Sequence, residues 1–350
     1  MCSFNELISL AYSRHASDLH ISAGRTPCCR INGSIKELLP ERLTPEQTRE
    51  IAFSVMNEHE RSCFENDGQV DFACYNPNIG RFRVNVFRQR NSIALVARIL
   101  NSDIPSPKEL GIPESVVEMI HKKRGLVLVT GPTGAGKTTT LASLINIINQ
   151  TYEKHIITLE DPIEYLHHHA KSIVNQREIG TDLKDYGSAL HSTLRQDPDV
   201  ILIGEMRDLE TISTAVTAAE TGHLVLSTLH TIGGAGTIDR IIDVFPPYQQ
   251  QQIRTQLAEV LECIVSQQLL PRADSEGLVA AMEVMIANAA VRNSIRDCKT
   301  YQIPSIIQTS KKAGMQTMDD AIYELYSKHL ITKDTALSFA QDRNALRNKI

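Results

Sequence analysis

Tryptophan is absent from this 350-residue chain, and aromatic residues make up only 5% of it. An excess of positive charge is also missing, because 36 Lys and Arg residues face 41 Asp and Glu residues, a formal net charge of −5. Proteins that bind nucleic acid usually carry a basic surface. The composition therefore argues against nucleic acid as the partner.

Long hydrophobic runs and paired cysteines are lacking as well. Apolar stretches such as 126–130 have the length of a strand, whereas a membrane-spanning helix needs about 20 apolar residues. The first residues show neither the basic start nor the apolar stretch of a secretory signal. The seven cysteines form no C-x-x-C pair, so we expect reduced thiols, no zinc site and a cytoplasmic protein.

The length allows about two domains, since single cores rarely grow beyond about 250 residues. Residues 71–75, 80–86 and 93–99 are typical of short strands. Within the second, alternation places Phe82, Val84 and Val86 on one face, and Arg81, Arg83 and Asn85 on the other. We predict a small α+β domain over residues 1–100 and a proline-rich linker over 101–112.

Residues 113–350 are predicted to form an α/β domain. Short apolar segments at 126–130, 156–159, 200–203 and 224–227 alternate with amphipathic segments, as in a parallel sheet covered by helices. Asp208 is a candidate N-cap for one of these helices, and Gly222 can end it. From Pro246 onward the pattern is mostly helical and shows no obvious active-site chemistry.

The strongest motif is a glycine-rich loop that directly follows the segment 126–130. The sequence from Gly131 to Thr138 fits G-x-x-x-x-G-K-[ST]. In such a loop, backbone N–H groups surround phosphate oxygens at the start of a helix. The lysine contacts the β and γ phosphates, and the following hydroxyl binds Mg²⁺. The predicted ATP-binding residues are Gly131, Pro132, Thr133, Gly134, Ala135, Gly136, Lys137, Thr138 and Thr139.

Hydrolysis also needs carboxylates, and two apolar segments end in acids. Residues 200–203 lead to Glu205, as expected of a Walker B strand, although such a strand usually ends in Asp. We predict that Thr138 and Glu205 form a metal site. Residues 156–159 lead to Glu160, with Glu164 four positions later. Carboxyl ends of parallel strands meet at the nucleotide-binding edge of a sheet. The alternative for each carboxylate alone is a solvated strand end.

Histidines offer a further candidate group. His223 and His230 flank the segment 224–229, which we expect to lie beside the nucleotide-binding strands. Spacing alone leaves a catalytic and a structural role equally open for both. For the run 167–169 no ligand partner is suitably spaced, so we expect a solvated loop.

Together these motifs resemble the secretion ATPase superfamily. The resemblance rests on the phosphate-binding loop, the acidic block 158–165, the block 194–208 and the histidine block ending at His230. Within that superfamily, residues 16–20, 174–180 and 290–297 look like the type IV pilus retraction ATPases, which power twitching motility. The last block departs from the usual pattern at Val291, Ser294 and Asp297.

The resemblance implies a hexameric ring of subunits, each with a PAS-like N-terminal domain and a RecA-like ATPase domain. It implies ATP and Mg²⁺ as cofactors and an inner-membrane pilus platform as partner, with the ring at the inner face of the cytoplasmic membrane. It also implies that N-terminal arginines reach a neighbour's nucleotide, for which Arg81 and Arg83 are our candidates. Their alternative role is a solvated basic strand face.

The sequence therefore predicts an ATP-driven motor for pilus retraction. Lys137 and Thr138 are expected to hold phosphate and metal, Glu205 to complete the metal site through water, and Glu160 or Glu164 to orient the attacking water. Two alternatives stay open: an ATP-binding accessory subunit without turnover, and a DNA-translocating RecA-like ATPase. The acidic composition argues against the second.

Overall fold

A computed structural model describes residues 3–31, 34–77, 79–100 and 103–350. The chain divides into two compact units, the first made of Met1–Asp103 with Pro162–Leu166, the second of Ile104–Asp161 with His167–Ile350. Residues 101 and 102 of the predicted linker lie outside the described residues. Each unit is described by itself below.

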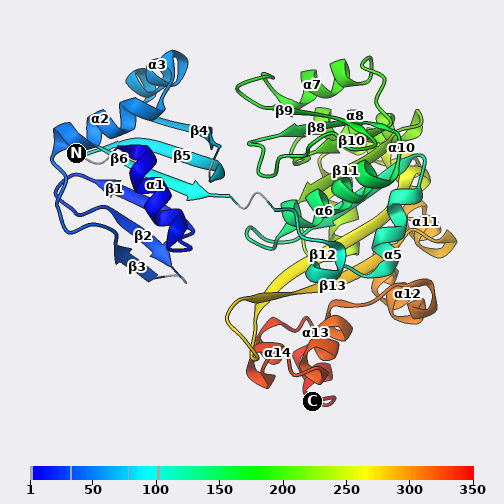
Figure 1. The fold of residues 1–350 in the computed structure, drawn as a ribbon. Helices are drawn as coiled ribbons and strands as arrows, with labels where there is room; N and C mark the ends of the chain where they lie inside the picture. Colours follow the sequence, from blue (N-terminus) through cyan, green and yellow to red (C-terminus); the bar gives the residue numbers. More distant parts are fainter. Residues whose placement is uncertain (1–2, 32–33, 78, 101–102) are drawn as a thin grey trace. The chain divides into compact units, whose positions relative to one another are not determined.

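The first unit is a six-stranded antiparallel sheet with helices packed on it (Figure 1). Its strand order is β3-β2-β1-β6-β5-β4. The helices are α1 (Phe4–Ser13), α2 (Pro45–Val55) and α3 (Glu58–Asp67), and the strands are β1 (Asp18–Ser22), β2 (Cys28–Ile31), β3 (Ser34–Glu37), β4 (Gln69–Asn76), β5 (Gly80–Gln89) and β6 (Ser92–Ile99). All three helices begin with a capping box, which satisfies backbone N–H groups at each start.

Strand β5 shows the alternation predicted from the sequence. Phe82, Val84 and Val86 are buried in the core, whereas the intervening residues are partly exposed. On that second face Arg83 forms an ion pair with Asp71 of β4, with a 2.6 Å distance from Nη2 to Oδ2. One face of this strand is therefore core and the other is polar, as expected.

The second unit is built on a seven-stranded sheet with the order β13-β12-β7-β11-β10-β8-β9. All neighbouring pairs are parallel except β12 with β13. The strands are β7 (Gly125–Thr130), β8 (His155–Glu160), β9 (Ile173–Glu178), β10 (Val200–Ile203), β11 (Leu224–Leu229), β12 (Leu261–Pro271) and β13 (Leu278–Ile286). The predicted α/β class, a parallel sheet covered by helices after a small α+β unit, is confirmed.

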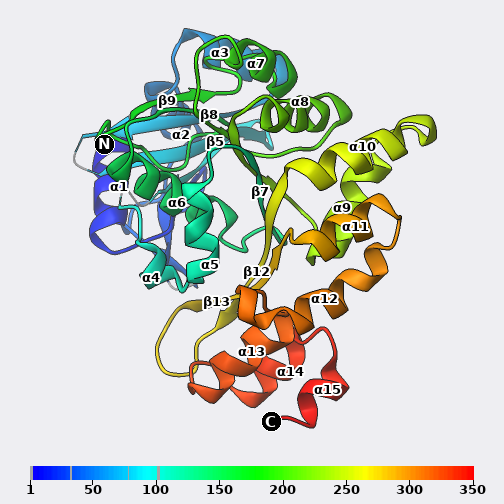
Figure 2. The same ribbon diagram turned by 90° about the vertical axis from the view of Figure 1, so that its right-hand side faces the viewer.

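Helices cover both faces of this sheet (Figure 2). Successive strand residues point to opposite faces, so Leu126 and Leu128 pack with α8, α9 and α10, while Val127 and Val129 pack with α5 and α6. The helices are α4 (Pro107–Leu110), α5 (Glu114–Val117), α6 (Lys137–Thr151), α7 (Tyr186–Thr193), α8 (Leu209–Glu220), α9 (Gly234–Asp243), α10 (Pro247–Val260), α11 (Ala289–Arg296), α12 (Ile303–Thr309), α13 (Met318–Ser327), α14 (Lys333–Phe339) and α15 (Arg343–Arg347).

Helix α8 begins where the sequence predicted. The Asp208 carboxylate accepts a hydrogen bond from the Thr211 N–H at 2.9 Å, and Ile212 and Val216 are buried. Leu209, the first residue of the helix, is 38% exposed.

The prediction of a mostly helical segment from Pro246 onward is wrong in one respect. Helix α10 is followed by the two long strands β12 and β13, which extend toward α13 and α14 at the end of the chain (Figure 1). Strand β12 pairs with β7 on one side and β13 on the other and is buried on both faces for most of its length. A strand buried on both faces lacks the alternation that identifies strands in a sequence.

Candidate functional site

The phosphate-binding loop, residues 131–136, connects the fully buried strand β7 to helix α6. Three of its glycines have positive φ angles: 143° at Gly131, 79° at Gly134 and 83° at Gly136. Lys137 opens the helix and is buried, and its Nζ donates hydrogen bonds to the carbonyls of Gly131 and Pro132 at 3.0 and 3.1 Å. The loop thus curves around the Lys137 ammonium group, which lies on the inner side of the loop.

Gln267 of β12 supports this loop, and the sequence analysis missed it. A Cβ atom on Gly131 would lie 2.2 Å from the Gln267 carbonyl oxygen, so only glycine fits there. The buried Gln267 side chain accepts a hydrogen bond from the Thr140 hydroxyl at 2.8 Å, and its amide would lie 3.0 Å from a Cβ on Gly136. Buried polar side chains usually have a hydrogen-bond partner, so a glutamine within an apolar segment was the signal in the sequence that could have identified Gln267.

Glu205 lies just beyond the end of β10, at the same sheet edge. Its Oε2 is 2.7 Å from Arg207 Nη2 and 3.3 Å from His230 Nε2. The hydrogen bond and charge of Glu205 raise the pKa of the Arg207 guanidinium. The Glu205 segment is fixed to β11, because Thr228 Oγ1 donates to the Gly204 carbonyl at 2.6 Å and the Met206 N–H donates to the Thr228 carbonyl.

The two predicted histidines lie at opposite edges of the sheet. His230 follows β11, and its Nδ1 is 3.5 Å from Thr133 Oγ1 in the phosphate-binding loop. His223 precedes β11, where its backbone carbonyl accepts from the Gly125 N–H and its Nδ1 is bonded to the Ala218 carbonyl. Six strand residues, about 20 Å of chain, separate the two histidines. The structure therefore brings His230, and not His223, to the loop of its own chain.

Glu160, at the end of β8, is buried and held by two side chains. Its Oε1 accepts hydrogen bonds from Thr158 Oγ1 at 2.6 Å and Gln176 Nε2 at 3.0 Å. It lies next to the Glu205 segment, because β8 and β10 are paired and the Gly204 N–H donates to the Leu159 carbonyl. Glu160 at the end of β8 and Glu205 after β10 thus lie at the same edge of the sheet, as predicted.

Tyr186 of α7 packs against this edge. Its hydroxyl would lie 2.7 Å from a Cβ on Gly204, so the tyrosine approaches the backbone there closely. Burial, followed by the negative charges of Asp161 and Glu160, raises the pKa of the Tyr186 hydroxyl well above its usual value. A neutral tyrosine therefore closes one side of the acidic edge.

The remaining predicted residues, Glu164, Arg81 and Arg83, belong to the first unit. Arg83 Nε lies 2.9 and 3.0 Å from the two carboxylate oxygens of Asp71, so this guanidinium is engaged within its own sheet. Glu164 lies in the short segment between β8 and β9 that packs with that unit.

The donor set at the loop suits Mg²⁺ bound together with a nucleotide. Thr138 lies in the first turn of α6, after β7, and is partly buried. Glu205 lies at the same sheet edge but after β10, which is separated from β7 by β11. Magnesium prefers oxygen ligands and usually keeps several waters and substrate phosphate oxygens. Among the described residues no group of three His, Cys, Asp or Glu side chains could hold a metal ion.

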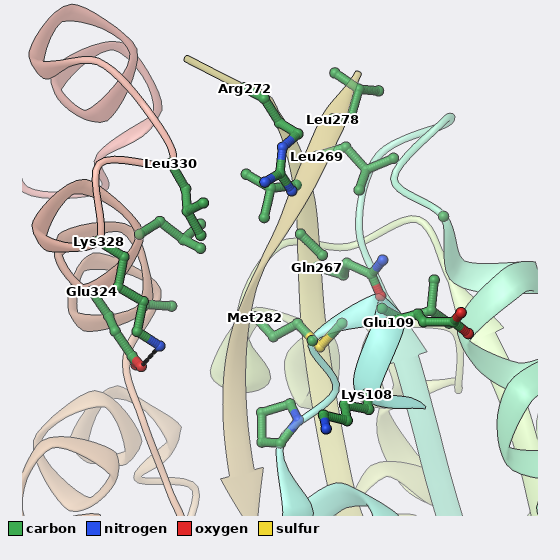
Figure 3. Close-up of a pocket in the computed structure, with 18 of the residues that line it drawn as sticks. Lys108, Glu109, Gln267, Leu269, Arg272, Leu278, Met282, Glu324, Lys328 and Leu330 are labelled. Atoms are coloured by element: carbon green, nitrogen blue, oxygen red, sulfur yellow. Dashed lines mark hydrogen bonds and ion pairs between the residues drawn. The ribbon is translucent and has the colours of Figure 1, made fainter. Parts of the chain in front are cut away.

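A cavity of about 520 Å³ lies beside the loop, next to Gly136 and Thr139. Figure 3 shows Gln267 and Leu269 of β12 at its centre, with Glu109 on one side and Lys328, the residue after α13, on the other. Lys328 Nζ is paired with Glu324 of α13 at 2.6 Å. This volume is in the range of pockets that bind small organic molecules.

The run 167–169 is only partly the solvated loop that we expected. His168 and His169 are exposed, but His167 is mostly buried and its Nδ1 has no hydrogen-bond partner in the described part of the chain. Burial and the neighbouring His168 lower the pKa of His167 to about 4. The Gln176 side chain that binds Glu160 also accepts from the His167 backbone N–H, at 2.7 Å.

No helix in the described ranges is both long enough and apolar enough to span a membrane.

Comparison with known proteins shows the family of the chain. The chain matches the family described as "Type II/IV secretion system protein" over residues 2–341. It is 46% identical to the twitching motility protein of Neisseria gonorrhoeae over 321 residues, covering 92% of this chain and 86% of that one. It is 45% identical to the type IV pilus retraction ATPase PilT of Pseudomonas aeruginosa over 331 residues, covering 95% and 96%.

A solved structure is also similar. The crystal structure of the pilus retraction motor PilT with bound ADP matches with a TM-score of 0.93 and 50% identity, covering 99% of this chain and 100% of that one. Sequence, fold and relatives agree over almost the whole chain, and the chain belongs to the type II/IV secretion system protein family.

Proposed function

We propose that this protein is an ATP-hydrolysing motor that powers type IV pilus retraction. The observation that carries the proposal is the connected edge formed by the phosphate-binding loop, His230 and Glu205, with contacts of 3.5 and 3.3 Å. The names of the similar retraction proteins support the same function.

The loop residues 131–139 hold the phosphates. Backbone N–H groups of the loop and the start of α6 attract the negative charge, and Lys137 exchanges its loop carbonyl partners for phosphate oxygens. The cavity beside Gly136 and Thr139 takes the nucleoside. Thr138 would hold Mg²⁺ directly and Glu205 would hold it through water, and the ion would supply positive charge that neutralises the phosphates.

The acids at the edge have separate tasks in this proposal. Glu160 or Glu164 orients the attacking water, and His230 connects Glu205 to the phosphate side of the loop. The buried Glu160 is held by Thr158 and Gln176, which fixes its orientation before the substrate binds. His223 has no role in the site of its own chain.

The working form in this proposal is a hexameric ring at the inner face of the cytoplasmic membrane, acting on a pilus platform protein. Arg81 and Arg83 of one subunit are our candidates for reaching a neighbour's nucleotide. An arginine supplied in this way is worth ~10³ to 10⁵ in rate. Arg83 would have to leave Asp71 to do so.

The test is steady-state ATP turnover of the full chain against protein concentration, with double-stranded DNA added in a parallel series. We expect turnover that rises with ring assembly and does not respond to DNA. Stimulation by DNA would instead indicate a translocase. Nucleotide binding without turnover at every concentration would indicate an accessory subunit.

A further inference from the structure

We infer that Glu283 and Ser266 are positioning residues for His230, which they hold in place through the loop that follows it. This inference rests on the proposed ATPase function. The segment concerned is the His loop, residues 230–233, which leads from the end of β11 into helix α9.

The His230 side chain is not fixed by packing. It is 42% exposed, and its contacts to Glu205 and Thr133 are the long ones of 3.3 and 3.5 Å. Its position at the edge therefore depends on the backbone that carries it. A displacement of about 1 Å in a catalytic constellation can reduce the rate about a hundredfold.

Two buried side chains hold that backbone. Ser266 and Glu283 are direct partners in the β12 and β13 pairing. Ser266 Oγ accepts from the Gly233 N–H at 2.9 Å, and Glu283 Oε1 accepts from the Gly234 N–H at 2.7 Å. These N–H groups belong to the first turn of α9, where no helical carbonyl is available, so the side chains replace the missing acceptors.

The backbone approaches the strands too closely for larger residues. A Cβ atom on Gly234 would lie 2.9 Å from the Met285 sulfur, and Gly233 has a φ of 76°. From there a hydrogen-bond chain leads back to His230. Thr237 Oγ1 donates to the Gly233 carbonyl at 2.8 Å and lies 2.7 Å from the Thr231 hydroxyl, the residue next to His230.

Two consecutive residues of strand β12 therefore support the two loops of the site, the His loop and the phosphate-binding loop. Ser266 pairs with Thr130, the last residue before the phosphate-binding loop, and faces α9. Gln267 faces α6 and supports the phosphate-binding loop. Since successive strand residues point to opposite faces, one strand holds the loop that binds phosphate and the loop that carries His230.

Glu283 also connects the His loop to the C-terminal helices. Burial raises the pKa of the Glu283 carboxyl above its usual value, and the Gly234 and Met318 N–H groups and the Gln341 side chain partly offset this effect. The starts of α9 and α13 therefore both lie beside this one buried carboxyl group. Lys328, which follows the other end of α13, lines the cavity beside the phosphate-binding loop.

The test compares Glu283→Met, Ser266→Ala and a matched control in the full chain. Methionine removes the acceptor oxygens of Glu283 and keeps a side chain of similar length. The control is Glu262→Met, which removes a partly buried carboxylate on β12 at the opposite sheet edge, where it binds Lys122 and Arg292. We expect kcat to fall roughly tenfold to a hundredfold in Glu283→Met and Ser266→Ala. We expect KM and nucleotide affinity to stay within about twofold, because the phosphate-binding loop keeps its own support.

Hydrogen exchange supplies a readout that does not depend on turnover. Amide exchange of the peptide covering residues 230–237 should accelerate in both variants and stay slow in Glu262→Met. Unchanged exchange in both variants would overturn the inference, as would faster exchange with an unchanged kcat. If the wild-type chain showed no turnover, the proposed function would fail, whereas the exchange result would still decide whether these residues hold the loop.

Discussion

The imidazole Nε2 of His230 lies 3.3 Å from the carboxylate of Glu205. Neither residue belongs to a regular element, since one follows β11 and the other follows β10. They meet because these strands are parallel neighbours in register, with Ile203 beside Ser227. Their carboxyl ends reach the same sheet edge as the phosphate-binding loop, where the chemistry of the proposed function takes place.

Replacing Glu205 by Gln should preserve ATP binding and remove most turnover. The amide keeps the size of the side chain but loses the charge that faces Arg207 and the proposed metal site. Nucleotide titration together with a phosphate-release assay measures both quantities. The matched control is Glu210→Gln, an exposed carboxylate on α8, which should behave like the wild type. Undiminished turnover in Glu205→Gln would refute the assignment.

The two histidines should respond differently to the same substitution. His230→Gln should lower kcat by roughly tenfold or more, because the residue contacts both the loop and Glu205. His223→Gln should leave kcat within about twofold, because that side chain lies at the far edge of the sheet. Steady-state kinetics of both variants at equal protein concentration decides this. Equal losses would contradict the separation of the two sites.

Gly131→Ala should abolish nucleotide binding and lower the melting temperature. The new methyl group would lie 2.2 Å from the Gln267 carbonyl, so either β12 or the loop must move. Gly222→Ala is the control, because its φ of 119° is similarly unfavourable but no atom lies within 4 Å of the added Cβ. We expect the control to cost about 1 to 2 kcal/mol and to retain binding. Binding by Gly131→Ala with normal affinity would contradict the close approach.

His167 should make the second unit less stable in mild acid. Its pKa is about 4 in the folded chain against 6.5 as the ordinary value, so the folded state binds this proton more weakly. The contribution of neutral His167 to the free energy of unfolding is therefore fully present above pH 6.5. It decreases as the pH falls, and the loss reaches about 3 kcal/mol near pH 4.

Denaturant unfolding at pH 7 and pH 5 measures this contribution. His167→Gln should reduce the loss of stability between the two pH values, whereas His168→Gln, at the exposed neighbour, should largely preserve it. If the stability of His167→Gln depended on pH as that of the wild type does, the buried His167 would not be the cause of the loss of stability in acid.

Features that depend on neighbours in the sequence could be predicted. The phosphate-binding loop is a local structure, because its glycines and the start of α6 are consecutive residues. The acids after β8 and β10 could be placed at one edge once the strands were taken as parallel. The same reasoning could have separated His223 from His230, because one precedes and the other follows the same strand.

Other features were decided by the tertiary structure. The sequence pattern does not identify strands β12 and β13, because they are largely buried and do not alternate, and it therefore does not show what the side chains on them support. Gln267, Ser266 and Glu283 lie more than 30 residues from the loops they hold. The residues of the predicted phosphate-binding loop can be identified from the sequence alone, because they are consecutive. Only the pairing of β12 with β7 and β13 decided what holds those residues in place, since such contacts exist only after distant segments have packed together.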